Sequence, residues 1–162
     1  MSNFHGLSSP EELKKAWFNM TEGQGIDDVN VIWNFEPSVL NNIAAGLYVL
    51  NLLYPYIGNK TGHYVAFYKK GNERIYFDPL GTLPPKDILP YVNVVDLEGA
   101  QAINGNSCGY RCLTKLFKYA LGYKPEYKID IKGGKFVGNI KPETLFKTNR
   151  EFKILNNLND NC

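Results

Sequence analysis

The stretch HYVAFYKKGNERIYFDP, residues 63–79, sets the architecture of this chain. Its two runs of β-branched and aromatic residues, His63–Lys70 and Arg74–Phe77, flank Gly71-Asn72, which is typical of a tight turn between antiparallel strands. Asp78-Pro79 ends the second run, because proline cannot donate a hydrogen bond to a central strand ladder. The sequence therefore predicts a β-hairpin.

The hairpin brings a histidine and a carboxylate together. With a two-residue turn at Gly71-Asn72, Val65 lies opposite Asp78, and His63 is within diagonal reach of the carboxylate. With the turn at Lys70-Gly71, His63 faces Asp78 directly. A three-residue turn would break this parity unless a bulge restored it. A carboxylate so placed fixes the tautomer of a histidine and stabilises the imidazolium that forms when the ring takes a proton.

Cys108 is the candidate nucleophile for this pair. Residues 108–121 have helical spacing and Gly122 follows as a stop, so Cys108 opens a helix after a polar loop. Amides at a helix start stabilise a thiolate, and a nearby imidazolium lowers the pKa of a thiol further. In the loop, Gln101 carries a side-chain amide that could donate to a developing oxyanion.

Each of these residues also has an ordinary structural interpretation. A histidine at a strand start is commonly structural, Asp-Pro after a strand commonly forms a turn, and a helical cysteine is commonly a core residue. We give Cys112, one turn after Cys108, that core interpretation. Cys108, Cys112 and the two histidines of the chain do not have the spacing of a standard zinc site. Cys162 has no assigned role.

The remaining elements predict an α+β fold, with a small, mainly antiparallel sheet packed against helices in a single domain over residues 1–162. Ser8-Ser9-Pro10-Glu11-Glu12 reads as a helix start, and that helix runs to about Met20. The other expected elements are a buried helix from Pro37 to Leu53, a strand over residues 91–97, a short strand over residues 129–131 and a final helix over residues 142–158.

Composition excludes several classes of protein. The chain has 162 residues and a net charge of +2, with 18 basic and 16 acidic residues, so no strong electrostatic partner is expected. Three cysteines are too few for a disulfide framework and fit a reducing, intracellular compartment. The most apolar stretch, residues 43–57, is interrupted by polar residues and proline and is too short to span a bilayer.

Three motifs together resemble the adenovirus endopeptidase (adenain) family of cysteine proteases, in the clan of the SUMO-specific proteases. They are Gly62-His63-Tyr64-Val65-Ala66-Phe67, Ile75-Tyr76-Phe77-Asp78-Pro79-Leu80-Gly81 and Gln101-x6-Cys108-Gly109-Tyr110-x-Cys112. The order of histidine, acid, glutamine and cysteine is that of the clan. Tyr64 stands where the family commonly has tryptophan, and Asp78 where the adenovirus enzyme has glutamate.

The resemblance implies roles for four residues: His63 as general base, Asp78 as orienting acid, Cys108 as nucleophile at the start of a central helix, and Gln101 as oxyanion donor. Small proteases of this kind occur in virophages and virus-like transposons, where they mature capsid proteins, often after Gly-Gly. By resemblance we expect polypeptide substrates, with no cofactor and no metal. We expect a monomer in the host cytoplasm or viral factory, and packaging in the virion is an option.

Alternatives stay open at this point. One is a deconjugating protease that acts on ubiquitin-like modifiers, and another is a catalytically silent capsid-assembly module. The adenovirus enzyme uses DNA and a peptide as activators, but the near-neutral charge of this chain gives little support for DNA. We further expect the aromatic ring of Tyr64 to narrow the channel to the thiolate, and an extended substrate to pair with a free edge of the hairpin.

Overall fold

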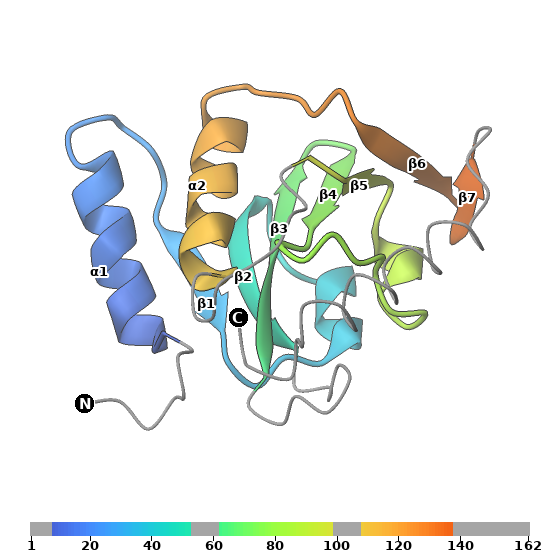
Figure 1. Cartoon of the computed structure of the whole chain (residues 1–162), viewed down its shortest axis with the longest axis horizontal. Helices are drawn as coiled ribbons and strands as arrows, with labels where there is room; N and C mark the ends of the chain where they lie inside the picture. The colour runs from blue at the N-terminus through green and yellow to red at the C-terminus, as the bar shows by residue number, and fades with distance from the viewer. Residues whose placement is uncertain (1–7, 53–61, 99–107, 138–162) are drawn as a thin grey trace.

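A computed structural model of the chain describes residues 8–52, 62–98 and 108–137. They form an α+β fold with one seven-stranded sheet in the order β1-β2-β3-β4-β5-β6-β7. The pairs β1–β2 and β4–β5 are parallel and the other four pairs are antiparallel, so the sheet is mixed and mostly antiparallel. Figure 1 shows helices α1 and α2 beside the β1–β3 side of the sheet, with β6 and β7 at the far edge.

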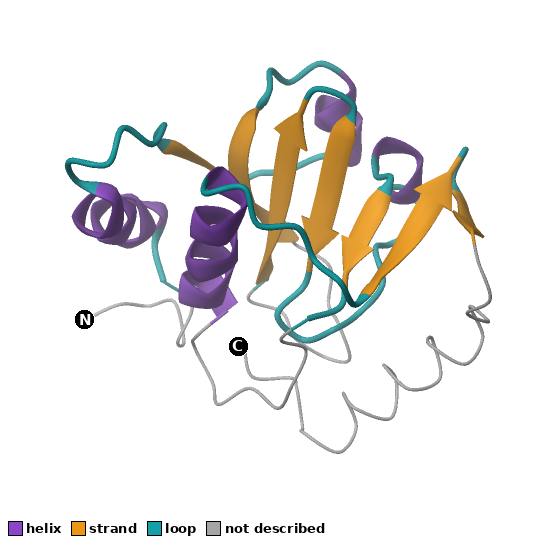
Figure 2. Ribbon diagram, turned by 90° about the horizontal axis from the view of Figure 1, so that it is seen from above, coloured by secondary structure: helices purple, strands orange, loops and turns teal. Residues whose placement is uncertain are grey.

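The element bounds follow the chain. Helix α1 spans Pro10–Thr21 and α2 spans Cys108–Ala120. The strands are β1 Val29–Ile32, β2 Gly46–Leu52, β3 His63–Lys70, β4 Glu73–Phe77, β5 Val94–Asp96, β6 Lys128–Lys132 and β7 Lys135–Val137. Figure 2 shows the strands side by side, with α1 and α2 as separate rods at one end of the view.

Both faces of the sheet are buried. One apolar cluster lies between the two long helices and the sheet and contains Leu13, Trp17, Val49, Ala66 and Leu116. A second cluster covers the opposite face, where the 3-10 helix Pro37–Asn41 and the segment before β5 supply apolar side chains. A sheet covered on both faces holds its inner strands in fixed positions, which suits the positioning of reactive side chains.

Of the two helices predicted in the first third of the chain, one is confirmed and the other is wrong. The first is confirmed: Ser9 caps α1, its hydroxyl accepts from the Glu12 amide at 3.1 Å, and the Glu12 carboxylate accepts from the Ser9 amide at 2.8 Å. The second is wrong, because the described part of that stretch, residues 37–52, contains the 3-10 helix Pro37–Asn41 and strand β2. Strand β2 lies between β1 and β3 and is buried on both faces, and such a strand shows the same unbroken apolar run as a buried helix.

The hairpin is confirmed, and its register is now fixed. Lys70 pairs with Glu73 and Ala66 with Phe77, so the two-residue turn is Gly71-Asn72 rather than Lys70-Gly71. The expected free edge is wrong. Strand β3 pairs with β2 and strand β4 pairs with β5, so both outer edges of the hairpin are already hydrogen-bonded. An extended substrate therefore has no open hairpin edge to join.

Smaller differences concern the strands that follow. The strand expected at 91–97 is shortened to β5, because Leu89–Tyr91 form a 3-10 helix. The short strand at 129–131 is confirmed as β6, whereas β1 and β7 were not predicted. The helix expected over residues 142–158 lies outside the described residues.

Candidate active site

His63 is held at the first position of β3 by a side chain of the neighbouring strand. The amide of His63 donates to Asn51 Oδ1 at 3.1 Å, and both residues are fully buried. Gly62, directly before it, has a φ of 95°, and a Cβ there would lie 2.3 Å from Asn51 Oδ1. A backbone without a Cβ is thus what lets Asn51 reach the His63 amide.

We expect Gly62→Ala to destabilise the fold and to displace the start of β3. The left-handed backbone costs an alanine about 1–2 kcal/mol, and the contact with Asn51 would displace the start of β3 as well. Gly71→Ala is the matched control, because Gly71 also has a positive φ of 59° but a Cβ added there would meet nothing within 4 Å. Thermal unfolding of the two variants measures the loss of stability. Equal behaviour of the two variants would contradict this role of Gly62.

Asp78 lies beside the imidazole of His63. The distance from His63 Nε2 to Asp78 Oδ1 is 2.7 Å, and both side chains are completely shielded from solvent. A carboxylate at this distance accepts a hydrogen bond, so Nε2 carries the proton and Nδ1 is the nitrogen with the lone pair. This arrangement can fix the ring and its tautomer as a general base requires.

The environment keeps Asp78 ionised. Burial by itself raises the pKa of a carboxyl, but the charge of His63 and hydrogen bonds from His63, Thr82 and the Leu80 amide outweigh it, and the pKa of Asp78 is lower than its ordinary value. The Leu80 amide donates to Asp78 Oδ1 at 2.8 Å, and the Thr82 hydroxyl donates to Oδ2. The carboxylate is therefore available as the anionic partner of an imidazolium.

The first turn of α2 packs against the start of β3. Cys108 is the first residue of the helix, and a Cβ on the next residue, Gly109, would lie 3.1 Å from the ring of Tyr64. Tyr64 directly follows His63 in β3. The start of α2 therefore lies beside Tyr64, the residue that follows His63 in β3.

A buried ionic cluster fixes the middle of α2. Lys115 Nζ lies 3.3 Å from Asp96 Oδ2 and 4.9 Å from the ring centre of Phe77, and the Tyr119 hydroxyl donates to Asp96 at 2.5 Å. Burial is the main reason why the pKa of Asp96 is raised, and these partners only partly offset it. The cluster links α2 to the ends of β4 and β5, immediately before Asp78.

The cysteines differ in state. Cys112 is free and fully buried, and burial, followed by the charge of Asp78, raises the pKa of its thiol well above the usual value. This confirms its core interpretation. Cys108 is disulfide-bonded and also buried. The odd cysteine count did not predict a disulfide at this position, and the sulfur of Cys108 must be reduced before it can act as a nucleophile.

Some expected site features are changed or lie outside the described chain. Gln101 and Cys162 are outside the described residues. Tyr64 is buried, its hydroxyl donates to the Ser8 carbonyl at 2.6 Å, and its ring packs beneath the start of α2. The ring is therefore part of the core rather than the wall of a substrate channel.

Sequence reasoning missed Asn51 and Thr82. Asn51 lies in the stretch that was predicted to be a helix, so its hydrogen bond with the His63 amide of β3 was not predicted. Thr82 had a signal: Asp78-Pro-Leu-Gly is a turn motif in which the aspartate accepts from its own downstream backbone, and the Leu80 amide does donate to Asp78. Because the chain reverses direction at this turn, the Thr82 hydroxyl lies next to the Asp78 carboxylate.

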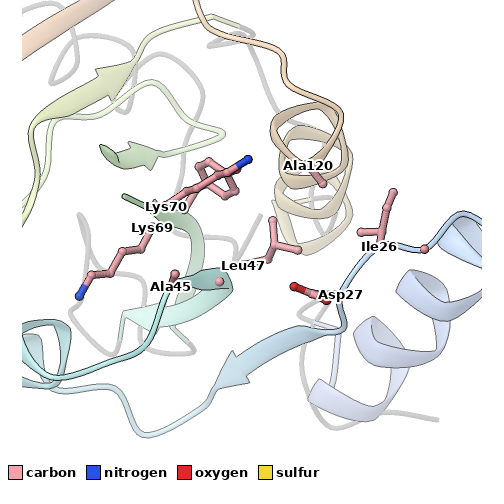
Figure 3. Close-up of a pocket in the computed structure, with 10 residues that line it drawn as sticks. Ile26, Asp27, Ala45, Leu47, Lys69, Lys70 and Ala120 are labelled. Carbon is pink, nitrogen blue, oxygen red and sulfur yellow. The ribbon is translucent and has the colours of Figure 1, made fainter. Parts of the chain in front are cut away.

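A separate pocket lies at the other end of α2 (Figure 3). It has a volume of about 280 Å³ and is lined by the last helical residue Ala120, by Leu47 of β2 and by the Lys69–Lys70 end of β3. Helix α2 has 13 residues, so its last residue, Ala120, lies about 18 Å along the helix from Cys108 at a rise of about 1.5 Å per residue. The pocket therefore does not belong to the His63–Asp78 site.

Neither a metal cluster nor a membrane-spanning helix occurs in the described part of the chain. Within residues 8–52, 62–98 and 108–137, no group of three or more histidine, cysteine or acidic side chains is arranged to hold a metal ion. No helix in these ranges has the length and apolar character needed to cross a membrane.

Comparisons with protein-family models, with curated proteins and with solved structures find no match to this chain. The function therefore has to be inferred from the site itself.

Proposed function

We propose that the chain is a cysteine endopeptidase in which Cys108 is the nucleophile, His63 the general base and Asp78 the residue that orients the base. The observation that carries the proposal is the buried 2.7 Å contact between His63 and Asp78 beside the helix that Cys108 opens. A structural interpretation of the pair alone would leave unexplained why a cysteine opens the helix beside it.

The chemistry would proceed through a thioester. Nδ1 of His63 accepts the proton of the Cys108 thiol, and the thiolate attacks the carbonyl carbon of the scissile peptide bond. The resulting oxyanion is held by donors, which the resemblance assigns to Gln101 and to the Cys108 amide. His63 then gives its proton to the leaving amine as the C–N bond breaks, and a water molecule hydrolyses the thioester.

Two changes from the state described above are required. The disulfide of Cys108 must be reduced, and the sulfur, which is now shielded from solvent, must become accessible to a substrate. Proteolysis should therefore depend on a thiol reductant in the assay.

The resemblance to the adenovirus endopeptidase family suggests the substrate: extended segments of viral structural proteins, cut after small residues such as Gly-Gly. Glycine lets a substrate backbone lie close to a buried sulfur without a Cβ collision. This preference has no support from a hairpin edge or from the Tyr64 ring, because both edges are paired and the ring is buried. It rests on the resemblance and on the burial of Cys108.

The test compares two substrate types with the reduced protein. Short Gly-Gly peptides with flexible flanks are given in one assay and intact ubiquitin-like conjugates in another, and products are identified by mass spectrometry. We expect cleavage of the peptides and no activity on the conjugates. Strong activity on conjugates with negligible peptide turnover would favour a deconjugating protease, and no turnover of either would favour the silent capsid-assembly module.

A further inference from the structure

Both oxygens of the Asp78 carboxylate are engaged. Oδ1 accepts from His63 and from the Leu80 amide, and Oδ2 accepts from the hydroxyl of Thr82. Thr82 is itself buried, with 3% of its surface exposed, and Asp78 has 2% exposed. Among the residues that the structure describes, the Thr82 hydroxyl is the donor that reaches Oδ2.

The hydroxyl matters because an aspartate carboxylate turns easily. The torsion that orients a carboxylate is broad and roughly two-fold, so the hydrogen bonds from His63 and Leu80, both on Oδ1, do not by themselves fix its plane. A donor on the second oxygen does so, and it also spares a buried anionic oxygen the cost of having no partner. Threonine is suited to this position because its β-branched side chain restricts the first torsion.

We propose that Thr82 is a positioning residue that orients the Asp78 carboxylate and thereby selects the tautomer of His63 with the proton on Nε2. The consequence for catalysis rests on the proposed function: Nδ1 of His63 then carries the lone pair that takes the Cys108 proton. The effect on the tautomer does not rest on the proposed function, because it concerns only Thr82, Asp78 and His63. The hydroxyl also contributes to the lowered pKa of Asp78.

The first measurement reads the tautomer directly. The chain has two histidines, so ¹⁵N-histidine NMR gives a spectrum simple enough to assign with a His5→Gln variant. In a Cys108→Ala background, which removes the thiol proton from the exchange, we expect the Nε2–H tautomer of His63. Adding Thr82→Val, which keeps the shape and removes the hydroxyl, should give a mixture of tautomers, and Thr82→Ser should restore the single form.

The second measurement is kinetic and uses the full chain with Cys108 intact. Loss of one hydrogen bond to a charged group should lower kcat about 10-fold for Thr82→Val with little change in KM, and Thr82→Ser should recover most of it. In an Asp78→Asn background, Thr82→Val should have no further effect on kcat. Thermal unfolding of each variant separates this effect from a loss of folded protein.

The outcomes distinguish the two proposals. If Thr82→Val shifts the tautomer of His63 but the reduced wild-type chain shows no proteolysis, the role of Thr82 is upheld and the proposed function is overturned. An unchanged tautomer in folded Thr82→Val overturns the role of Thr82, whatever the activity of the wild type. A serine variant that behaves like valine overturns it too, because the hydroxyl would then not be the group that acts.

Discussion

Cys108→Ala and His63→Ala are each expected to reduce kcat for peptide hydrolysis on the order of 10⁶-fold, and the double variant should lose no more than either single one. The reason is that nucleophile and base act as a unit: without the base the thiol is not deprotonated, and without the sulfur there is no attacking group. Initial rates on a Gly-Gly peptide under reducing conditions measure the effect.

The controls address folding and chemistry separately. Cys112→Ala removes the neighbouring cysteine, whose buried thiol has a raised pKa, and should keep near-wild-type turnover. His63→Ala leaves the buried Asp78 without its main partner, which can cost about 3–5 kcal/mol of folding free energy. His63→Gln therefore serves as a second variant if alanine unfolds. Turnover by folded Cys108→Ala would contradict the assignment.

Asp78→Asn should lower kcat about 10⁴-fold while the protein stays folded. An asparagine keeps the shape of the side chain but carries no charge, and its amide can present a donor to Nε2, which would favour the wrong tautomer of His63. Asp130→Asn is the matched control, because the Asp130 side chain is 54% exposed on β6 and pairs with Lys128. Equal activity of the two variants would show that Asp78 is only a turn residue.

The same variant has a pH signature. Because the folded chain lowers the pKa of Asp78 below its ordinary value of 3.8, the ionised carboxylate stabilises the fold above about pH 4. That stabilisation is lost as the pH falls through the folded-state pKa. Acid unfolding of Asp78→Asn should therefore depend less steeply on pH than that of the wild type, as fluorescence measured across pH 2–6 would show.

The sequence predicted the parts of this fold that local patterns specify. Gly71-Asn72 predicted the turn of the hairpin, and Ser9 with Glu12 predicted the start of α1. Both predictions depend on only a few adjacent residues. The His63–Asp78 contact followed from the hairpin alone. These predictions succeeded because the physical cause lies within the segment itself.

The features that failed depend on neighbours distant in the chain. Strand β2 was read as a helix because burial on both faces removes the alternation that marks a strand. The hairpin was expected to have a free edge because no local pattern indicates that β2 pairs with β3 or that β5 pairs with β4. Asn51 was missed for the same reason, since it reaches His63 from the neighbouring strand β2. Thr82 is different: it lies close to Asp78 in the chain, and the turn motif that places it there was a local signal.

Selective alkylation tests most directly whether Cys108 is an activated nucleophile. The chain is reduced, treated with limiting iodoacetamide at pH 6–7, and mapped by mass spectrometry of its peptides, in parallel for wild type and for folded His63→Gln. We predict that Cys108 is labelled fastest in the wild type and that this advantage disappears without the imidazole. Preferential labelling of Cys112 or Cys162, or equal labelling of Cys108 in both proteins, would contradict the proposed role of the Cys108–His63 pair.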